Sequence, residues 1–201
     1  MINRRRVGIL GGTFDPIHIG HLHIAQCARH DLHLDEVIYM PAGSPPHKPD
    51  QRLTDGEERL AMIDAAIEGI EGLGSSDIDL QRDTPSYTNE LLKKYQMQHP
   101  CIDLWFIMGS DSLHEFHTWN RPNSILDLAR LAVAERPGWL IRNMAEHAEA
   151  PDLLRSVDRF NSVPIDLSST TIRKCLAQDL PVDWLVPPQV LSLIQKKTLY
   201  R

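Results

Sequence analysis

Short apolar runs alternate along this chain with longer segments in which apolar residues recur every three or four positions. The first run, Val7–Leu10, is followed by a helix-periodic segment from Ile17 to Leu32 and then by a second run, Glu36–Met40. A strand, a helix and a strand in this order favour parallel pairing, because the helix returns the chain to the edge where the first strand began. The pattern therefore predicts an α/β fold built on a parallel sheet.

The later segments continue the same alternation. Ile102 and Leu104–Met108 form the most apolar stretch, which is expected to be a central strand covered on both faces. The weakly periodic segment 139–160 is interpreted as a peripheral insertion. Further strands are expected at Asp77–Leu80, near a sheet edge, at Leu131–Ala134 and at Val163–Leu167. Further helices are expected to begin at the capping box Thr54–Glu57, at Pro85–Thr88, at Ser168 and at Pro187-Pro188.

Length, charge and cysteine content narrow the class of protein. The 201 residues suit one domain, 1–201, with a small helical C-terminal element. The net charge of −6 argues against a nucleic-acid partner, which needs a basic face. Three scattered cysteines are too few for a disulfide scaffold or a CxxC metal site. Because the chain has no apolar signal core and no run of membrane-spanning length, we expect a cytoplasmic protein without a membrane partner. The sequence leaves its oligomeric state open.

The segment richest in candidate site residues, Gly11–Leu22, directly follows the first predicted strand. Two glycines and a proline break the strand, and a helix follows, so unpaired backbone N–H groups at the helix start favour a phosphate. His18 and His21 are three residues apart, which places them on one face of the first helical turn. Gly20 between them leaves room for an anion. The alternative from the residues alone is half of a zinc site, although no nearby Cys or carboxylate completes a metal set.

Other loops that follow predicted strands carry side chains suited to nucleotides. His47 and Lys48 lie on a rigid proline-rich loop, and Asp111 follows the central strand, where it can reach a ribose hydroxyl. Thr88, at a helix entry, suits a carboxylate ligand, and Trp119 offers an aromatic face for stacking. Another predicted helix N-terminus carries hydroxyl side chains and a guanidinium group, which can donate hydrogen bonds to phosphate oxygens. These residues are Ser168, Ser169, Thr170 and Arg173. Since these strands end at one sheet edge, we expect the loops to converge there.

The segment GTFDPIHIGH resembles the signature of the HxGH-type nucleotidyltransferases, and the rest of the chain is similar to one branch of them, the bacterial nicotinate mononucleotide adenylyltransferases. Seven motifs follow that family's order over nearly the whole length: GTFDPIHIGHL, PPHK, PSYT, MGSDSL, TW, ERPG and SSTTIRK. The resemblance implies a Rossmann-like, doubly wound sheet. It also implies transfer of AMP from ATP to nicotinate mononucleotide, which gives deamido-NAD and pyrophosphate with Mg²⁺ as cofactor.

The resemblance also implies roles for individual residues, with no protein ligand assigned to a metal. The catalytic residues would be His18, His21 and Arg173. ATP would be bound by Gly12, Thr13, Phe14, Ile107, Gly109, Asp111, Arg136, Ser168, Ser169 and Thr170. Nicotinate mononucleotide would be bound by His47, Lys48, Thr88, Asn89, Trp119 and Asn120, with Trp119 stacked on the pyridine ring and the N–H groups of Asn89 and Asn120 near its carboxylate.

Three alternatives remain beside this interpretation. Pantetheine-phosphate adenylyltransferases share the first signature and the reaction type, but usually have threonine where this chain has His18. A class I aminoacyl-tRNA synthetase fragment would have the HIGH sequence, but also a KMSKS segment, whose place SSTTIRK takes here. A nucleotide-binding regulator without catalysis is the alternative from a different class.

Overall fold

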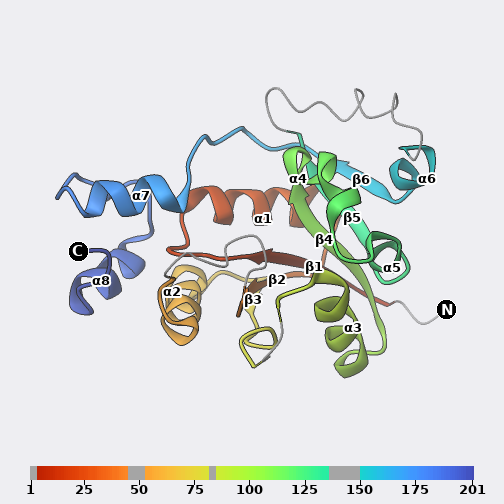
Figure 1. Ribbon diagram of the computed structural model, residues 1–201, viewed down its shortest axis with the longest axis horizontal. Coiled ribbons are helices and arrows are strands. Elements are labelled where there is room, and N and C mark those ends of the chain that lie inside the picture. Colours follow the sequence, from red (N-terminus) through yellow and green to blue (C-terminus); the bar gives the residue numbers. More distant parts are fainter. Residues whose placement is uncertain (1–3, 45–52, 82–84, 136–149) are drawn as a thin grey trace.

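The centre of the molecule is a parallel six-stranded sheet (Figure 1). The computed structural model describes residues 4–44, 53–81, 85–135 and 150–201. The strand order is β3-β2-β1-β4-β5-β6, so the chain first builds outward from β1 in one direction and then, from β4 onward, in the other. The strands are β1 (Arg5–Gly12), β2 (Glu36–Pro41), β3 (Leu73–Ser75), β4 (Ile102–Gly109), β5 (Arg130–Ala134) and β6 (Val157–Phe160).

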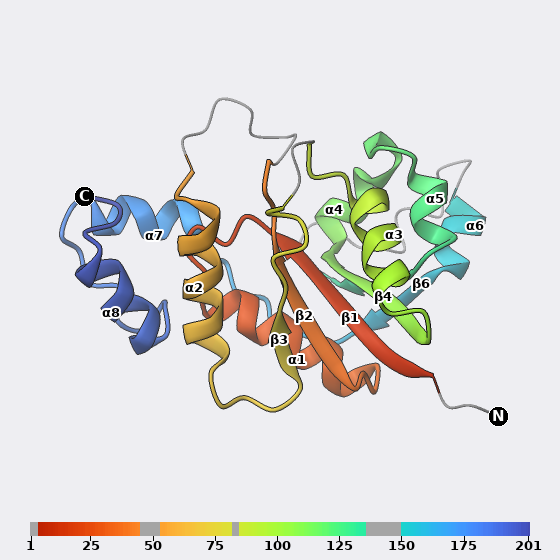
Figure 2. The same ribbon diagram turned by 90° about the horizontal axis from the view of Figure 1, so that it is seen from below.

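Helices cover both faces of this sheet. Buried residues of α1 (Ile19–Asp31), α2 (Gly56–Ile67), α7 (Ser169–Leu176) and α8 (Pro188–Lys196) belong to the core on one face. Residues of α3 (Thr88–Gln98), α4 (Ser110–His114) and α5 (Pro122–Leu126) belong to the core on the other face, and α6 (Ala150–Arg155) packs beside it. The helix α8 lies beside α2 (Figure 2), and α7 and α8 lie at the end of the molecule opposite α5 and α6 (Figure 1). A short 3₁₀ turn, η1 (Phe116–Thr118), precedes α5.

The central strand β4 shows why its sequence is almost entirely apolar. Trp105 and Ile107 point into the core beneath α1 and α2, whereas Leu104, Phe106 and Met108 point into the core beneath α3. A strand that is buried on both faces has no solvent side on which polar residues could alternate. The predicted doubly wound parallel sheet is therefore confirmed, with β4 between β1 and β5.

Two expectations from the sequence are wrong near the β3 edge of the sheet. The third strand is Leu73–Ser75, paired with Val37–Tyr39, and not Asp77–Leu80. The latter segment is a turn in which Leu80 N–H donates to the Asp77 carbonyl at 2.8 Å. Ile78 and Asp79 are both buried there, so the alternation of polar and apolar residues does not correspond to alternating faces. The cap of α2 also differs, because Asp55, and not Thr54, is its N-cap and accepts from Glu57 N–H.

The opposite edge of the sheet also differs from the expectation. The last strand is Val157–Phe160, which pairs with Leu131–Ala134 and lies inside the segment interpreted as an insertion. The expected strand Val163–Leu167 pairs with no other strand, and Leu167 N–H donates to the Ile165 carbonyl at 3.0 Å, with Val163 68% and Ile165 39% exposed. Within the described ranges, no helix is long and apolar enough to cross a membrane.

The strand β6 contains a charged residue, Asp158, because its carboxylate is bonded by side chains of β4 and β5. Asp158 accepts hydrogen bonds from Arg130 at 2.7 Å and from Trp105 Nε1–H at 2.7 Å. The bond from Arg130, followed by that from Trp105, lowers the pKa of Asp158 against the opposing effect of burial. A depressed carboxyl pKa stabilises the fold above the unfolded-state pKa of about 3.9, and this stabilisation disappears as the pH falls through the lower, folded-state value.

We therefore expect Asp158→Asn to lower the free energy of unfolding at pH 7 by about 1 kcal/mol, because the site is partly exposed. The difference from the unmodified protein should persist at pH 5 and shrink below about pH 3.9. Urea unfolding across this range measures it. The control is Asp103→Asn, whose ion pair with Arg4 is about half exposed and should contribute almost nothing. An equal loss in the two variants would contradict the prediction.

Candidate active site

A tight turn at the carboxyl end of β1 begins the site. Phe14 has a left-handed backbone (φ 51°), and its ring lies against the backbone of Gly12, where an added Cβ would be 2.9 Å from a ring carbon. The same ring packs edge-on against His21, with centroids 4.9 Å apart, and against Tyr39. Glycine at position 12 thus allows Phe14 to fold back and support His21. Phe14 is fully buried, so its side chain supports the site from behind.

Asp15 joins this turn to three distant parts of the chain. Its carboxylate is 2% exposed and accepts from Tyr200 Oη–H at 2.6 Å and from Thr54 N–H at 3.3 Å. Its carbonyl accepts from Arg173 Nη1 at 2.6 Å. The buried Arg59 donates to the Thr13 carbonyl at 2.8 Å and to the Thr54 carbonyl at 2.9 Å. The turn is therefore held by α2, by α7 and by the end of the chain.

His18 and His21 lie together at the start of α1. Their rings are stacked, with centroids 3.7 Å apart and planes 25° from parallel. His18 is the N-cap residue, and its backbone N–H donates to His21 Nδ1 at 3.3 Å. Because Nδ1 of His21 accepts, the proton of its neutral ring is on Nε2, which makes Nε2 a donor. Gly20 lies against the His18 ring, where a Cβ would be 3.1 Å from two ring atoms.

The start of α7 lies next to the turn after β1. Ser168 caps this helix and accepts from Thr171 N–H at 3.1 Å, whereas Ser169 Oγ donates to the Pro16 carbonyl at 2.9 Å. Arg173 reaches Asp15 through Nη1 and Thr170 Oγ1 through Nη2. The hydroxyls of Ser168 and Ser169 thus have partners within the protein. Arg173 is held beside the turn by two of its nitrogens, and its guanidinium has five N–H groups in all.

A cavity of about 390 Å³ opens at the carboxyl end of β1, and we call it the β1 cavity. Gly12 and Thr13 form one side, Thr88 at the start of α3 another, and Trp119 with Asn120 a third. The Trp119 ring packs on Phe106 and Phe116, with centroids 5.8 and 5.5 Å away. The β1 cavity thus combines an aromatic wall with the N-terminal end of a helix.

A second cavity, of about 570 Å³, lies at the start of α1, and we call it the α1 cavity. Gly20, His23 and Ile24 of α1 form one wall, and every residue from 162 to 168 contributes to another. Asp111 of α4 and Glu135 after β5 complete its polar lining. The segment Gly11–Leu22 therefore lines both cavities, the first with its strand end and the second with its helix start.

The structure separates the candidate site residues into groups. The β1 cavity is lined by Gly12, Thr13, Thr88, Trp119 and Asn120, and the α1 cavity by Asp111 and Ser168. Eight candidates line neither cavity and lie at the turn after β1, in the first turns of helices or at the end of β4: Phe14, His18, His21, Asn89, Gly109, Ser169, Thr170 and Arg173. Ile107 is fully buried, and its side chain packs in the core near Gly8. His47, Lys48 and Arg136 lie outside the described residues.

Sequence reasoning missed several residues that line the cavities. Asp79 in the β1 cavity was part of an expected strand, although it is buried and its Oδ2 accepts from Gly43 N–H at 3.2 Å. His23 and the segment 162–167 line the α1 cavity. The sequence holds a signal for that segment, because Pro164 cannot donate to a sheet ladder and so argues against an interior strand.

The described residues do not form a metal-binding site of their own. Among residues 4–44, 53–81, 85–135 and 150–201, no group of three His, Cys, Asp or Glu side chains could hold a metal ion. The stacking of His18 on His21 also differs from the convergence of two imidazoles on one ion.

The chain is similar to known proteins over nearly its whole length. The family model described as cytidylyltransferase-like matches residues 9–175. A protein of Clostridium botulinum named "Probable nicotinate-nucleotide adenylyltransferase" is 40% identical over 98% of each chain, and one of the same name from Thermomicrobium roseum is 39% identical over 98% of this chain and 92% of its own. The solved structure of Plasmodium falciparum nicotinic acid mononucleotide adenylyltransferase, complexed with NaAD, superposes with a TM-score of 0.77 at 21% identity, covering 98% of this chain and 97% of that one.

Proposed function

The chain belongs to the cytidylyltransferase-like family and, within it, to the nicotinate-nucleotide adenylyltransferases, and on that premise we propose how it transfers AMP from ATP to nicotinate mononucleotide. We assign ATP to the α1 cavity and the nicotinate ring to the β1 cavity. The observation that carries this assignment is that one segment, Gly11–Leu22, contributes Gly12 and Thr13 to the β1 cavity and Gly20 to the α1 cavity. The stacked rings of His18 and His21 belong to the same segment. The two phosphates that react would then meet at these histidines.

The chemistry is an in-line displacement at phosphorus. An oxygen of the mononucleotide 5′-phosphate forms a bond to the α-phosphorus of ATP, and the bond from that phosphorus to the β-bridging oxygen breaks, which releases pyrophosphate. A phosphate monoester has a second pKa of about 6, so the attacking oxygen is largely deprotonated at neutral pH. The enzyme therefore needs no strong general base, and positioning together with charge stabilisation accounts for the rate.

The two histidines would stabilise negative charge that develops during the transfer. His21 presents Nε2–H because its Nδ1 is held by the backbone of His18. A donor that is fixed before the reaction loses no reorganisation energy when the charge appears. His18 is 4% exposed beneath Gly20, at the helix N-terminus that also favours an anion.

Arg173 would neutralise the leaving pyrophosphate from the other side. Its contacts to Asp15 and Thr170 fix the guanidinium next to the turn. A planar guanidinium with several N–H groups can bond two phosphate oxygens at once. Ser168 and Ser169 act mainly by setting the start of α7, because their hydroxyls bond to Thr171 and Pro16.

The β1 cavity suits a planar ring that carries a carboxylate. Trp119 offers its face, and the N–H groups at the start of α3, at Thr88 and Asn89, suit an anion. A neutral carboxamide gains less from these donors than a carboxylate does. This arrangement supports a preference for the acid over the amide form of the mononucleotide.

Magnesium enters this proposal as part of the substrate. The described residues offer no set of three ligands for a metal. Mg²⁺ commonly keeps several waters and binds nucleotide phosphates with only one or two protein carboxylates. We therefore propose that it arrives on ATP, and no step of the transfer is assigned to a metal held by the protein.

A substrate panel tests the function. Purified protein with Mg-ATP should release pyrophosphate with nicotinate mononucleotide, and should do so at least tenfold more slowly with nicotinamide mononucleotide, because one charge-assisted contact is lost. Phosphopantetheine should give no turnover above background. Coupled pyrophosphate detection, with the dinucleotide product identified by mass spectrometry, gives the readout. Equal or faster use of phosphopantetheine would overturn the assignment.

A further inference from the structure

One wall of the α1 cavity is a segment that belongs to no helix or strand. The wall segment, residues 161–168, follows β6 but has no strand pairing of its own. At its end it is fixed by the cap of α7 and by the bond from Ser169 Oγ to the Pro16 carbonyl. Val163 and Ile165 are exposed to 68% and 39% although they are apolar, so burial does not fix the middle of the segment. Its distance from α1, and so the width of the cavity, must depend on specific contacts.

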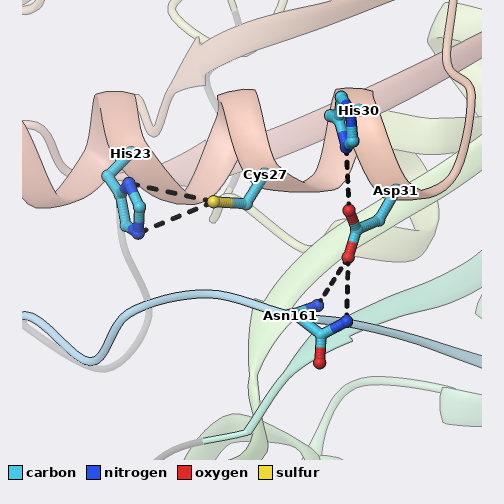
Figure 3. Close-up of polar contacts among 5 residues, drawn as sticks. All are labelled: His23, Cys27, His30, Asp31 and Asn161. Atoms are coloured by element: carbon cyan, nitrogen blue, oxygen red, sulfur yellow. Dashed lines mark hydrogen bonds and ion pairs between the residues drawn. The ribbon is translucent and has the colours of Figure 1, made fainter.

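Those contacts come from two side chains of α1, which Figure 3 shows in part. His23 Nε2 accepts the backbone N–H of Val163 at 3.1 Å. Two turns further along, Asp31 Oδ2 accepts from Asn161 N–H at 2.9 Å and from Asn161 Nδ2 at 3.2 Å (Figure 3). The first residues of the wall segment are therefore tied to the helix that begins with His18 and His21.

The chemistry of both side chains fits this tethering role. Since His23 accepts at Nε2, the proton of its neutral ring is on Nδ1, and the ring is packed against Cys27, whose Sγ lies 3.6 Å from Nε2 (Figure 3). Asp31 is the last residue of α1, where the helix dipole disfavours a negative charge. Its hydrogen bonds to His30 and to Asn161 stabilise the carboxylate against this effect, and they lower the pKa of Asp31.

We propose that His23 and Asp31 are positioning residues that set the affinity for ATP by holding the wall segment on α1. The inference rests on the proposed function in that it assigns the adenosine part of ATP to the α1 cavity. His23 itself lines this cavity, whereas Asp31 does not, so an effect of Asp31 on ATP must pass through the wall segment.

A pair of substitutions at position 23 tests the acceptor directly. Glutamine places an amide oxygen close to the site of Nε2, whereas asparagine places it near Nδ1, too short to reach Val163. We expect His23→Asn to raise KM for ATP about fivefold, the change expected from one net hydrogen bond, and His23→Gln to stay within about twofold. Asp31→Ala should raise it about threefold. In all three variants kcat and KM for nicotinate mononucleotide should stay within about twofold, because the reacting groups are untouched.

The control is His33→Asn, an exposed residue with a left-handed backbone that asparagine tolerates well, and it should change nothing. Calorimetric Kd values for ATP accompany the kinetics, and thermal melting confirms that each variant is folded. Unchanged KM and Kd in His23→Asn and Asp31→Ala, or equal losses in His23→Asn and His23→Gln, would overturn the inference. If the unmodified protein binds ATP but forms no dinucleotide, the proposed function fails, and the Kd values still decide this inference. Absence of ATP binding would overturn both.

Discussion

Replacing His21 with asparagine is expected to lower kcat by about 10²–10³-fold, the usual effect of removing one fixed donor from a developing negative charge. Asparagine keeps an acceptor near the position of Nδ1, so it can still receive the backbone N–H of His18. What it lacks is the Nε2–H donor. Because this donor acts mainly in the transition state, KM for both substrates should change little while kcat and kcat/KM fall together.

The matched variant is His21→Gln, which reverses the change. Its amide N–H lies close to the position of Nε2, but its acceptor no longer reaches the His18 N–H. We expect it to keep more of kcat than His21→Asn does, and to lose more thermal stability, because the first turn of α1 loses a bond. Steady-state kinetics and melting curves separate the two effects. Full turnover in His21→Asn would show that the histidine is structural and would remove it from the mechanism.

The elements that could be predicted are those whose local pattern agrees with their place in the fold. The β4 run is apolar because both of its faces are buried, and the start of α1 combines a strand end, a turn and a periodic helix. In both cases the residues themselves carry the information. The loops after β1 and β4 lie at the same edge of the sheet because the carboxyl ends of parallel strands share it, whereas Ser168 follows a segment that is not a strand and His47 lies outside the described residues.

The edge strands could not be predicted, because their sequences reflect tertiary contacts. β3 is the short segment Leu73–Ser75, and its Gly74 leaves room for the Ile38 side chain, where a Cβ would be 2.9 Å away. β6 carries Asp158 because a distant arginine and a tryptophan bond to it. Conversely, the segment 163–167 resembles a strand because it contains Val163, Ile165 and Leu167, but it lines a cavity. A short edge strand has few residues, and its partners lie far away in the sequence.

The candidate site divides in the same way. The histidines and the hydroxyl-rich helix start could be found from spacing alone. The support behind them could not, because nothing in the sequence relates Tyr200, Arg59 or Thr54 to the turn after β1, yet they hold Asp15 and Thr13. These contacts depend on how α2 and the C-terminal residues pack, which local patterns do not contain.

Arg59→Met is expected to lower the free energy of unfolding by about 3–5 kcal/mol, the range found when one member of a buried charged group is removed. Arg59 is 2% exposed, so burial lowers the pKa of its guanidinium, and the carboxylates of Asp15, Asp55 and Asp79 offset this only in part. Methionine fills a similar volume but cannot donate to the Thr13 and Thr54 carbonyls. It would also remove one of the two guanidinium groups, those of Arg59 and Arg173, that lie near the buried Asp15.

Two controls separate charge from geometry in this prediction. Arg59→Lys keeps the charge but loses the forked pair of donors, and it should cost an intermediate amount. Lys197→Gln removes an exposed ion pair between Lys197 Nζ and Glu58 Oε1, which are 2.6 Å apart. Glu58 lies on α2, as Arg59 does, and this substitution should lower the free energy of unfolding by less than about 1 kcal/mol. Urea unfolding followed by circular dichroism gives all three values. A loss below 1 kcal/mol in Arg59→Met would mean that Tyr200 and Thr54 satisfy Asp15 by themselves. A large loss, accompanied by a lower kcat at temperatures where the variant is folded, would mean that Arg59, which lines neither cavity, sets the conformation of the turn after β1 and with it the position of the histidines.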